Sequence, residues 1–249
     1  MKCIILAAGY ATRLYPLTEN FPKPLLPVKG KAIIDWLLED VDLFPEITEH
    51  IIITNDRFRK HFETWRFTRH YKKPIHLVSD GSTTNENRLG AVRDLELAVR
   101  LLQLQEDALV LAGDNLLNFT LRGFLEYFQE RKSSCIMYYM EKDLEKQKKT
   151  AIITMDQLGR VQSMTEKPEK PESCWAVPPF YLYTPEDLQR IGEAIAEGCG
   201  TDAPGSFAAW LASHSNIYAY PMPGKRYDIG NLETYQHAKD VFHEKPVRK

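Results

Sequence analysis

The chain has 249 residues, of which 43% are hydrophobic and 27% are charged, and its formal net charge is −2. This apolar content is enough for a large core and predicts a folded protein. A net charge near zero gives no overall attraction to polyanions, so we expect neither a nucleic-acid nor a membrane partner.

Cysteine spacing predicts unpaired thiols in a reducing compartment, and hydropathy predicts no membrane span. None of the cysteines has CxxC spacing, so neither a zinc site nor a disulfide framework is predicted. They are Cys3, Cys135, Cys174 and Cys199. No apolar run approaches the roughly 18 residues of a membrane span. The first apolar run is too short for a signal peptide, so we expect a cytoplasmic protein.

Short apolar runs rich in β-branched residues predict buried strands in the first part of the chain. They cover residues 3–7, 50–55, 74–79, 108–114 and 134–140. Segments with helical periodicity accompany them, at residues 32–41, 57–67, 89–103 and 121–132. Strands that alternate with helices predict βαβ units and a mainly parallel sheet covered on both faces.

The pattern changes from about residue 149. The following segments predict, in order, a hairpin, an apolar stretch, a helix, a strand and a C-terminal helix. They cover residues 150–168, 175–184, 186–198, 216–222 and 232–243. The sequence contains no internal repeat and no linker, so we expect one α/β domain over residues 1–249.

Polar and glycine-containing segments follow three of the predicted strands. They are residues 8–23, 79–88 and 113–115. Ligands of open α/β sheets bind outside the carboxyl ends of the strands, so these segments are candidates for a binding site.

The stretch LAAGYATRLYPLTENFPKPLLPV, residues 6–28, is the most informative of these segments. Gly9 allows close approach of the backbone to a ligand, and N–H groups in such a turn can bind phosphate. Four prolines restrict the loop and hold Arg13 and Lys23 in place. The spacing matches neither the dinucleotide fingerprint nor the P-loop. The pattern indicates a polyphosphate clamp, and a rigid structural loop with solvated cations is the alternative.

Two acidic residues are candidates for a metal site. Asp114 follows a buried strand in LAGDN, where a carboxylate can bind a hard cation such as Mg²⁺; capping of the next element is the alternative. Asp228 lies in KRYDIGN, where Gly230 permits a sharp turn beside the acid. Spacing alone does not decide whether the two acids meet on one metal.

The loop at residues 6–28 is very similar to the signature loop of the sugar-1-phosphate nucleotidyltransferases, which include glucose-1-phosphate thymidylyltransferase. LAGDN at 111–115, EKP at 166–168 and YDIG at 227–230 follow in the family's order, so the resemblance covers most of the chain. It implies a three-layer α/β/α sandwich with a mixed, mostly parallel central sheet.

The reaction implied by the resemblance joins an NTP and a phosphorylated small-molecule acceptor, giving an NDP-sugar and pyrophosphate. The nucleotide-binding half would cover about residues 1–115 and the acceptor-binding half about residues 116–249. Mg²⁺ would be the cofactor.

The resemblance also implies a role for individual residues. Arg13 would hold the β- and γ-phosphates, and Lys23 would bridge the α-phosphate and the incoming phosphate. The nucleotide would lie against Leu6, Ala7, Ala8, Gly9 and Gly90. The metal would be held by Asp114 and Asp228, and the acceptor by Glu166 and Lys167.

The sequence departs from the family pattern at Ala11, where the family usually has a second glycine, and over residues 79–95, which align closely with no one member. The acceptor is the least determined feature. A sugar 1-phosphate is favoured, and a cytidylyltransferase acting on phosphocholine or an aminoalkylphosphonate is the nearest alternative. A non-catalytic regulatory paralogue is the second alternative. The preferred base and the formation of a homo-oligomer are left open.

Overall fold

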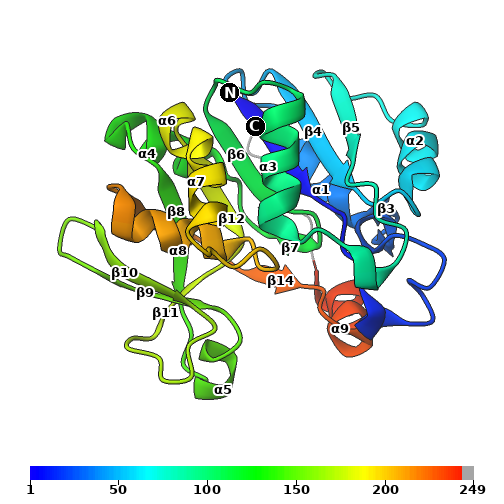
Figure 1. Cartoon of the computed structure of the whole chain (residues 1–249). Coiled ribbons are helices and arrows are strands. Elements are labelled where there is room, and N and C mark those ends of the chain that lie inside the picture. The colour runs from blue at the N-terminus through cyan, green and yellow to red at the C-terminus, as the bar shows by residue number, and fades with distance from the viewer. Residues whose placement is uncertain (243–249) are drawn as a thin grey trace. The chain divides into compact units, whose positions relative to one another are not determined.

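The computed structural model describes residues 1–242 (Figure 1). The chain divides into two compact units that are each built from separate segments. The first unit contains Met1–Lys2, Leu89–Leu111 and Gly123–Met222. The second contains Cys3–Arg88, Ala112–Arg122 and the segment from Pro223 onward. The single domain expected from the sequence stays a prediction.

The first unit is built on a sheet with the strand order β10-β9-β11-β8-β12-β6, in which neighbouring strands are antiparallel. Strand β13 pairs with β8 in parallel. The strands are β6 (Ala108–Ala112), β8 (Cys135–Met140), β9 (Ala151–Met155), β10 (Val161–Glu166), β11 (Trp175–Val177), β12 (Phe180–Tyr183) and β13 (Tyr218–Pro221). The predicted hairpin is the β9–β10 pair.

The helices of the first unit include two that the sequence pattern did not predict, at residues 144–147 and 205–214. They are α3 (Ala91–Leu101), α4 (Arg122–Arg131), α5 (Leu144–Gln147), α6 (Pro185–Gln189), α7 (Ile191–Ala196) and α8 (Gly205–His214). Helix α8 was missed because its apolar residues do not form one clear stripe, although Phe207 and Leu211 are fully buried. The predicted helix at 186–198 is two short helices that meet at Arg190.

The second unit has a sheet with the order β1-β4-β5, in which β4 and β5 are parallel, and two small antiparallel pairs, β2–β3 and β7–β14. Its strands are β1 (Lys2–Leu6), β2 (Pro27–Val28), β3 (Lys31–Ala32), β4 (Glu49–Thr54), β5 (Ile75–Ser79), β7 (Asn115–Leu117) and β14 (Arg226–Asp228). Its helices are α1 (Ile33–Val41), α2 (Arg59–Phe67) and α9 (Leu232–Val241), with 3₁₀ turns η1 (Thr12–Leu14), η2 (Lys23–Leu25) and η3 (Asn85–Asn87).

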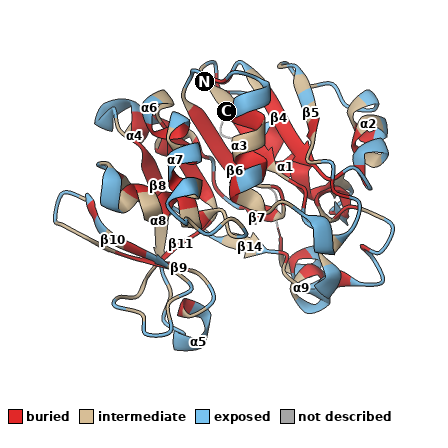
Figure 2. Cartoon of the chain, in the orientation of Figure 1, coloured by how far each residue is buried: buried red, intermediate tan, exposed pale blue. Residues whose placement is uncertain are grey.

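Buried side chains fix the proline-rich loop of the second unit to the protein. Figure 2 colours the buried residues of the chain red. Leu14, Leu26 and Val28 pack in one cluster with Trp36 of α1 and Tyr235 of α9. The Tyr235 hydroxyl also donates a hydrogen bond of 2.8 Å to the carbonyl of Pro27. Burial of several apolar side chains, each worth about 1.5–3 kcal/mol, holds this loop in one conformation.

The expected mixed sheet with flanking helices is confirmed, and each predicted strand of the first part of the chain appears within two residues of its place. The apolar stretch 175–184 forms two strands, because Pro178 and Pro179 cannot donate ladder hydrogen bonds. Helix α9 ends at Val241, and His243 of the predicted C-terminal helix lies outside the described residues. No helix among residues 1–242 is long and apolar enough to cross a membrane.

Candidate active site

The loop after β1 has two special backbone positions. Gly9 is exposed, and a Cβ added to it would meet no atom within 4 Å, so the space beside it is open. Ala11 has a left-handed conformation, with φ 48° and ψ 43°. Its carbonyl accepts hydrogen bonds from the Leu14 N–H (2.9 Å) and the Thr18 hydroxyl (2.8 Å). The loop therefore keeps the left-handed turn that suits glycine, at about 1–2 kcal/mol for a residue with a Cβ.

The backbone of residues 6–9 is fixed by the neighbouring strand. The Ala7 N–H donates to the Ile53 carbonyl at 2.8 Å, and the Asn55 side chain donates to the Ala8 carbonyl at 2.9 Å. Asn55 is fully buried. The sequence prediction did not include Asn55 in the site. The signal for it was its position as a polar residue at the end of the predicted strand 50–55.

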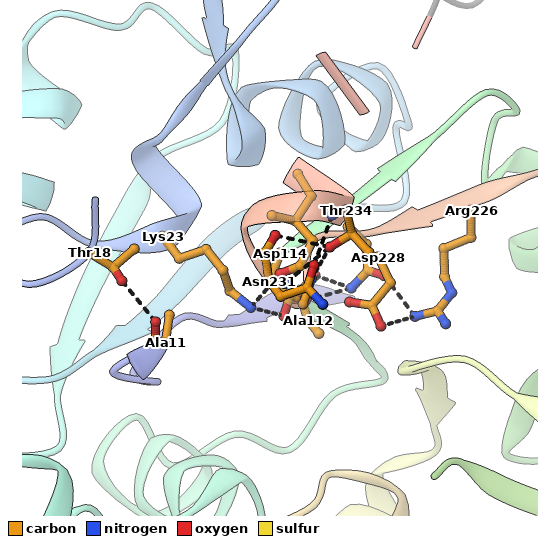
Figure 3. A network of polar contacts seen from close by, with 12 residues as sticks. Ala11, Thr18, Lys23, Ala112, Asp114, Arg226, Asp228, Asn231 and Thr234 are labelled. Atoms are coloured by element: carbon orange, nitrogen blue, oxygen red, sulfur yellow. Dashed lines mark hydrogen bonds and ion pairs between the residues drawn. The ribbon is translucent and has the colours of Figure 1, made fainter. Parts of the chain in front are cut away.

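Lys23 lies in η2 between Pro22 and Pro24, which restrict the backbone on either side of it. Its ammonium group donates to Asp114 Oδ2 at 2.6 Å and to the Ile229 carbonyl at 3.0 Å (Figure 3). The Lys23 side chain is only 14% exposed. The structure thus brings together a lysine, an acid and a carbonyl from three distant parts of the sequence.

Pairing of β7 with β14 brings the two candidate acids to one place. Asp228 is the last residue of β14 and lies opposite Asn115, which directly follows Asp114. The Ile229 N–H also donates to the Asp114 carbonyl at 3.2 Å. The sequence interpretation of YDIG as a turn was therefore incomplete, because Asp228 belongs to a short strand.

Arg226 is a further member of this network that the sequence analysis missed. Its guanidinium donates to Asn115 Oδ1 at 2.9 Å and lies 3.7 Å from Asp228 Oδ2. Asn115 in turn donates to Asp114 Oδ1 at 2.6 Å. Arg226 therefore connects the two acids through one ion pair and one amide.

The two carboxylates have opposite electrostatic environments. Burial raises the pKa of Asp114, but the charges of Lys23 and Arg226 oppose this and hold its pKa below the ordinary value. Partial loss of water and the neighbouring Asp114 charge raise the pKa of Asp228, although its side chain is 53% exposed. Asp114 is thus stabilised as a carboxylate, whereas the negative charge of Asp228 is opposed by that of Asp114. A cation bound between them would reduce this repulsion.

The chemistry of these donors fits Mg²⁺. Mg²⁺ is usually bound by one or two carboxylates, with water and substrate phosphates completing its shell. Residues 1–242 contain no group of three or more His, Cys, Asp or Glu side chains that could hold a metal without such help. The residues that would hold Mg²⁺ are Asp114 and Asp228.

Arg13 lies on the same side of the second unit as these acids. It is exposed, and its guanidinium is 3.9 Å from the position that a Cβ on Gly230 would occupy. Within residues 1–242, no hydrogen bond or ion pair is formed by its side chain. Its charge is therefore accessible to an anionic ligand.

The polar loop after β5 uses most of its side chains to fix its own shape. Asn87 Oδ1 accepts hydrogen bonds from the backbone N–H groups of Thr83 (3.1 Å) and Thr84 (3.0 Å). Ser82 contacts the hydroxyl of Tyr10, a buried residue of the β1–η1 loop, at 3.1 Å. These contacts connect the loop to the residues that follow Gly9.

The other predicted site residues belong to the first unit. Gly90 has φ +92°, and a Cβ on it would be 2.5 Å from the Thr201 carbonyl oxygen, so only glycine fits there. The N–H groups of Ala91 and Val92 donate to the carbonyls of Asp202 and Thr201. The start of α3 is therefore occupied by the protein's own backbone.

Glu166 ends β10, and Lys167 follows it with a left-handed φ of 49°. Burial raises the pKa of Glu166, while the charge of Lys167 opposes the rise. Gly205, the first residue of α8, makes room for the Glu166 carboxyl: a Cβ there would be 2.2 Å from Oε2. Sequence analysis missed Gly205 because it missed α8.

Comparisons with known proteins agree with this fold and loop. The curated relatives include the UTP–glucose-1-phosphate uridylyltransferase of Pseudomonas aeruginosa, which is 28% identical over 98% of this chain and 96% of its own length. The UTP–glucose-1-phosphate uridylyltransferase AglF of Haloferax volcanii is 26% identical over 100% of this chain and 99% of its own length.

Among solved structures, a UDP-glucose pyrophosphorylase complexed with UDP-glucose has the same fold, with a TM-score of 0.83 and 24% identity over 96% of this chain and 97% of that chain. The family model described as "Nucleotidyl transferase" matches residues 2–245. The resemblance noted in the sequence is therefore confirmed, and this chain belongs to the nucleotidyl transferase family.

Proposed function

We propose that this protein transfers a nucleotidyl group from an NTP to a sugar 1-phosphate, forming an NDP-sugar and releasing pyrophosphate. The observation that carries the proposal is the meeting of Lys23, Asp114 and Asp228 in the second unit. The relatives from P. aeruginosa and H. volcanii, both named as uridylyltransferases of glucose 1-phosphate, support a sugar 1-phosphate as acceptor.

The reaction needs charge compensation more than a general base. An oxygen of the acceptor phosphate attacks the α-phosphorus of the NTP, and the bond from that phosphorus to the oxygen of the β-phosphate breaks. The attacking oxygen is already anionic near neutral pH, so no proton has to be removed. The obstacles are the repulsion between two polyanions and the charge that develops on pyrophosphate.

Two basic side chains would perform this compensation. Lys23, held by Asp114 and the Ile229 carbonyl, would lie between the α-phosphate and the acceptor phosphate. Arg13 would bind the β- and γ-phosphates, since a guanidinium can form paired hydrogen bonds with phosphate oxygens. The open space beside Gly9 would let the nucleotide lie against the backbone of residues 6–9.

Asp114 and Asp228 would hold Mg²⁺, which when bound supplies positive charge to the reacting phosphates and favours an in-line approach. Asn115 and Arg226 would keep the two carboxylates in place. In the first unit, Glu166 would accept hydrogen bonds from acceptor hydroxyls, and the exposed Lys167 would bind the acceptor phosphate.

A screen of pyrophosphate release tests the proposal. Each of the common NTPs is combined with glucose 1-phosphate, mannose 1-phosphate, phosphocholine and aminoethylphosphonate, with Mg²⁺ and with EDTA. Pyrophosphate release with a sugar 1-phosphate, lost in EDTA and in Lys23→Ala, supports the proposal.

The other outcomes separate the two alternatives. Release with CTP and phosphocholine or aminoethylphosphonate alone would replace the sugar assignment by a cytidylyltransferase. Calorimetric NTP binding without release for any acceptor would indicate a non-catalytic regulatory paralogue.

A further inference from the structure

The second unit contains a hollow of about 570 Å³ that is separate from the Lys23–Asp114–Asp228 network. Helix α2 and the residues just after it form one wall, through Lys60, His61, Thr64, Trp65, Thr68 and Arg69. These positions recur every three or four residues, so they lie on one face. The opposite wall comes from Phe21, Leu25 and Pro27 of the proline-rich loop and from the β2–β3 hairpin. The volume is typical of small-molecule sites.

Part of the lining of this hollow is apolar and aromatic. Phe21 lies edge-on to His61, with 5.3 Å between the ring centroids, and Leu25 and Trp65 are each 7% exposed. The Trp65 indole N–H is already used in a hydrogen bond of 2.9 Å to Asp35. The aromatic faces therefore offer van der Waals contact to a flat ring.

The rim of the hollow is basic and carries no carboxylate. Arg69 pairs with Asp35 at 2.9 Å, and Lys31 pairs with Glu39 at 2.9 Å, so these two charges are partly compensated. Lys60 is exposed and forms no ion pair with any residue in the described part of the chain. Lys60 therefore gives the rim one uncompensated positive charge, which is complementary to an anionic group.

One polar atom at this wall has no partner. His61 Nδ1 is buried and forms no hydrogen bond with the described residues. Because solvent does not reach this atom, a ligand in the hollow does not reach it either, and binding there depends on the apolar lining and on Lys60.

We propose that this hollow is a second binding site, for a small organic anion that carries a flat apolar ring. The ring lies against Phe21, Leu25 and Trp65, and the anionic group lies at Lys60. Phe21 and Leu25 are each two residues from Lys23, so occupancy of the hollow bears on the loop that holds this lysine. The effect on the Lys23 loop rests on the proposed function, whereas binding of the anion to the hollow does not.

A titration with 8-anilinonaphthalene-1-sulfonate (ANS), followed by calorimetry, tests the binding site. The same titration with its uncharged analogue, N-phenyl-1-naphthylamine, shows how much the sulfonate group contributes to the affinity. We expect one ANS to bind per chain, at least about tenfold more tightly than the analogue, because a favourable charge contact is worth about 1.4 kcal/mol or more at a partly desolvated site. Equal affinity for the two probes would overturn the proposal.

Three variants locate the bound probe. Lys60→Glu reverses the rim charge, and Thr64→Phe narrows the hollow from an exposed position on α2. Each should weaken ANS binding about tenfold or more, with Thr68→Phe as the substitute if Thr64→Phe does not fold. The matched control is Lys72→Glu, which makes the same charge change at an exposed lysine outside the hollow. Equal losses in Lys60→Glu and Lys72→Glu would contradict the site.

Two further measurements exclude other occupants. Excess NTP should leave ANS bound, and displacement would place the probe at the nucleotide site. ANS stoichiometry should not change with protein concentration, and a fall on concentrating the protein would mean that a second copy covers the hollow. Either result would overturn the proposal.

The effect on the loop is measured separately. Saturating ANS should change the rate of pyrophosphate release in the wild type at least about twofold and leave Thr64→Phe unaffected. Unchanged turnover with ANS bound would overturn the coupling to Lys23. If the protein releases no pyrophosphate at all, the proposed function fails and the calorimetric titration still decides the site.

Discussion

The ammonium group of Lys23 lies 2.6 Å from Asp114, although 91 residues separate the two in the sequence. The backbone is restricted at both residues of the pair. Prolines flank Lys23, and the pairing of β7 with β14 begins directly after Asp114. A lysine held in this way keeps its charge in place before any phosphate arrives, which is the preorganisation that charge-stabilising catalysis requires.

Replacement of this lysine should abolish most of the activity and leave the fold intact. Lys23→Ala removes the charge that the proposed function places between the two reacting phosphates, so pyrophosphate release should fall by about 10²–10³-fold. The measurement is a steady-state rate with the best NTP and acceptor, beside thermal unfolding of the same sample. Lys72→Ala, at an exposed lysine of the same unit, is the control. Near-normal turnover in Lys23→Ala would rule out its assigned role.

The proposed Mg²⁺ requirement should depend on Asp228. Asp228→Asn removes one of two carboxylates, so the Mg²⁺ concentration for half-maximal rate should rise about tenfold or more. The comparison is Glu19→Gln, which removes an exposed acid of the same unit. Identical Mg²⁺ titrations for wild type and Asp228→Asn would show that this acid has only a structural role.

The same variant should be more stable than the wild type near neutral pH in the absence of metal. The pKa of Asp228 is raised in the folded state, so its ionisation opposes folding, and this penalty grows as the pH rises through the folded pKa. Urea unfolding at pH 7 and at pH 4.5 measures the difference. The advantage of Asp228→Asn should shrink at the lower pH; an advantage that grows on acidification would contradict the assigned pKa direction.

Two glycines should respond differently to substitution. Gly9→Val projects into open space, so it should leave the unfolding midpoint within a few degrees while weakening NTP binding about tenfold or more. Gly90→Ala forces a Cβ to 2.5 Å from the Thr201 carbonyl and strains a positive φ, so it should destabilise the protein. Calorimetry with NTP and thermal unfolding give both readings. Unchanged NTP affinity in Gly9→Val would remove the backbone of residues 6–9 from the nucleotide site.

The proposed role of Glu166 in acceptor binding can be tested by changing Glu166 itself and by changing its neighbour Gly205. Glu166→Gln keeps the shape of the side chain, and Gly205→Ala places a Cβ where the Glu166 carboxyl lies. Both should raise the KM for the acceptor about tenfold and leave the KM for NTP unchanged. Ser206→Ala, one position along α8, is the control. A rise in the KM for NTP instead would assign Glu166 to the other substrate.

Sequence reasoning predicted the local features of this protein well. Buried strands such as β1 and β4 are continuous apolar runs, and α1 to α4 have clear helical periods, so pattern alone was enough. Short elements were missed for a physical reason. Strands β7 and β14 have three residues each and exist because they pair with each other.

In the candidate site, too, local features were predicted and contacts between distant segments were not. Lys23 and Asp114 stand beside strong local signals, namely prolines and the end of a buried strand. Their contact, the position of Asp228 and the participation of Arg226 follow from pairing between distant segments, which spacing does not show. Ala11 stands where the family usually has glycine, and its backbone has the left-handed φ in spite of the methyl group, which the sequence alone did not predict.

The interleaving of the two units has a consequence for how the protein is made. The carbonyl of Ile229, which binds Lys23, lies 206 residues further along the chain, and Asp228 directly precedes it. A ribosome must therefore synthesise the chain through β14 before that strand can reach β7. Until that moment the nascent chain carries a lysine with one of its two partners and an acid without its counterpart, so a prematurely terminated product would lack the proposed magnesium pair.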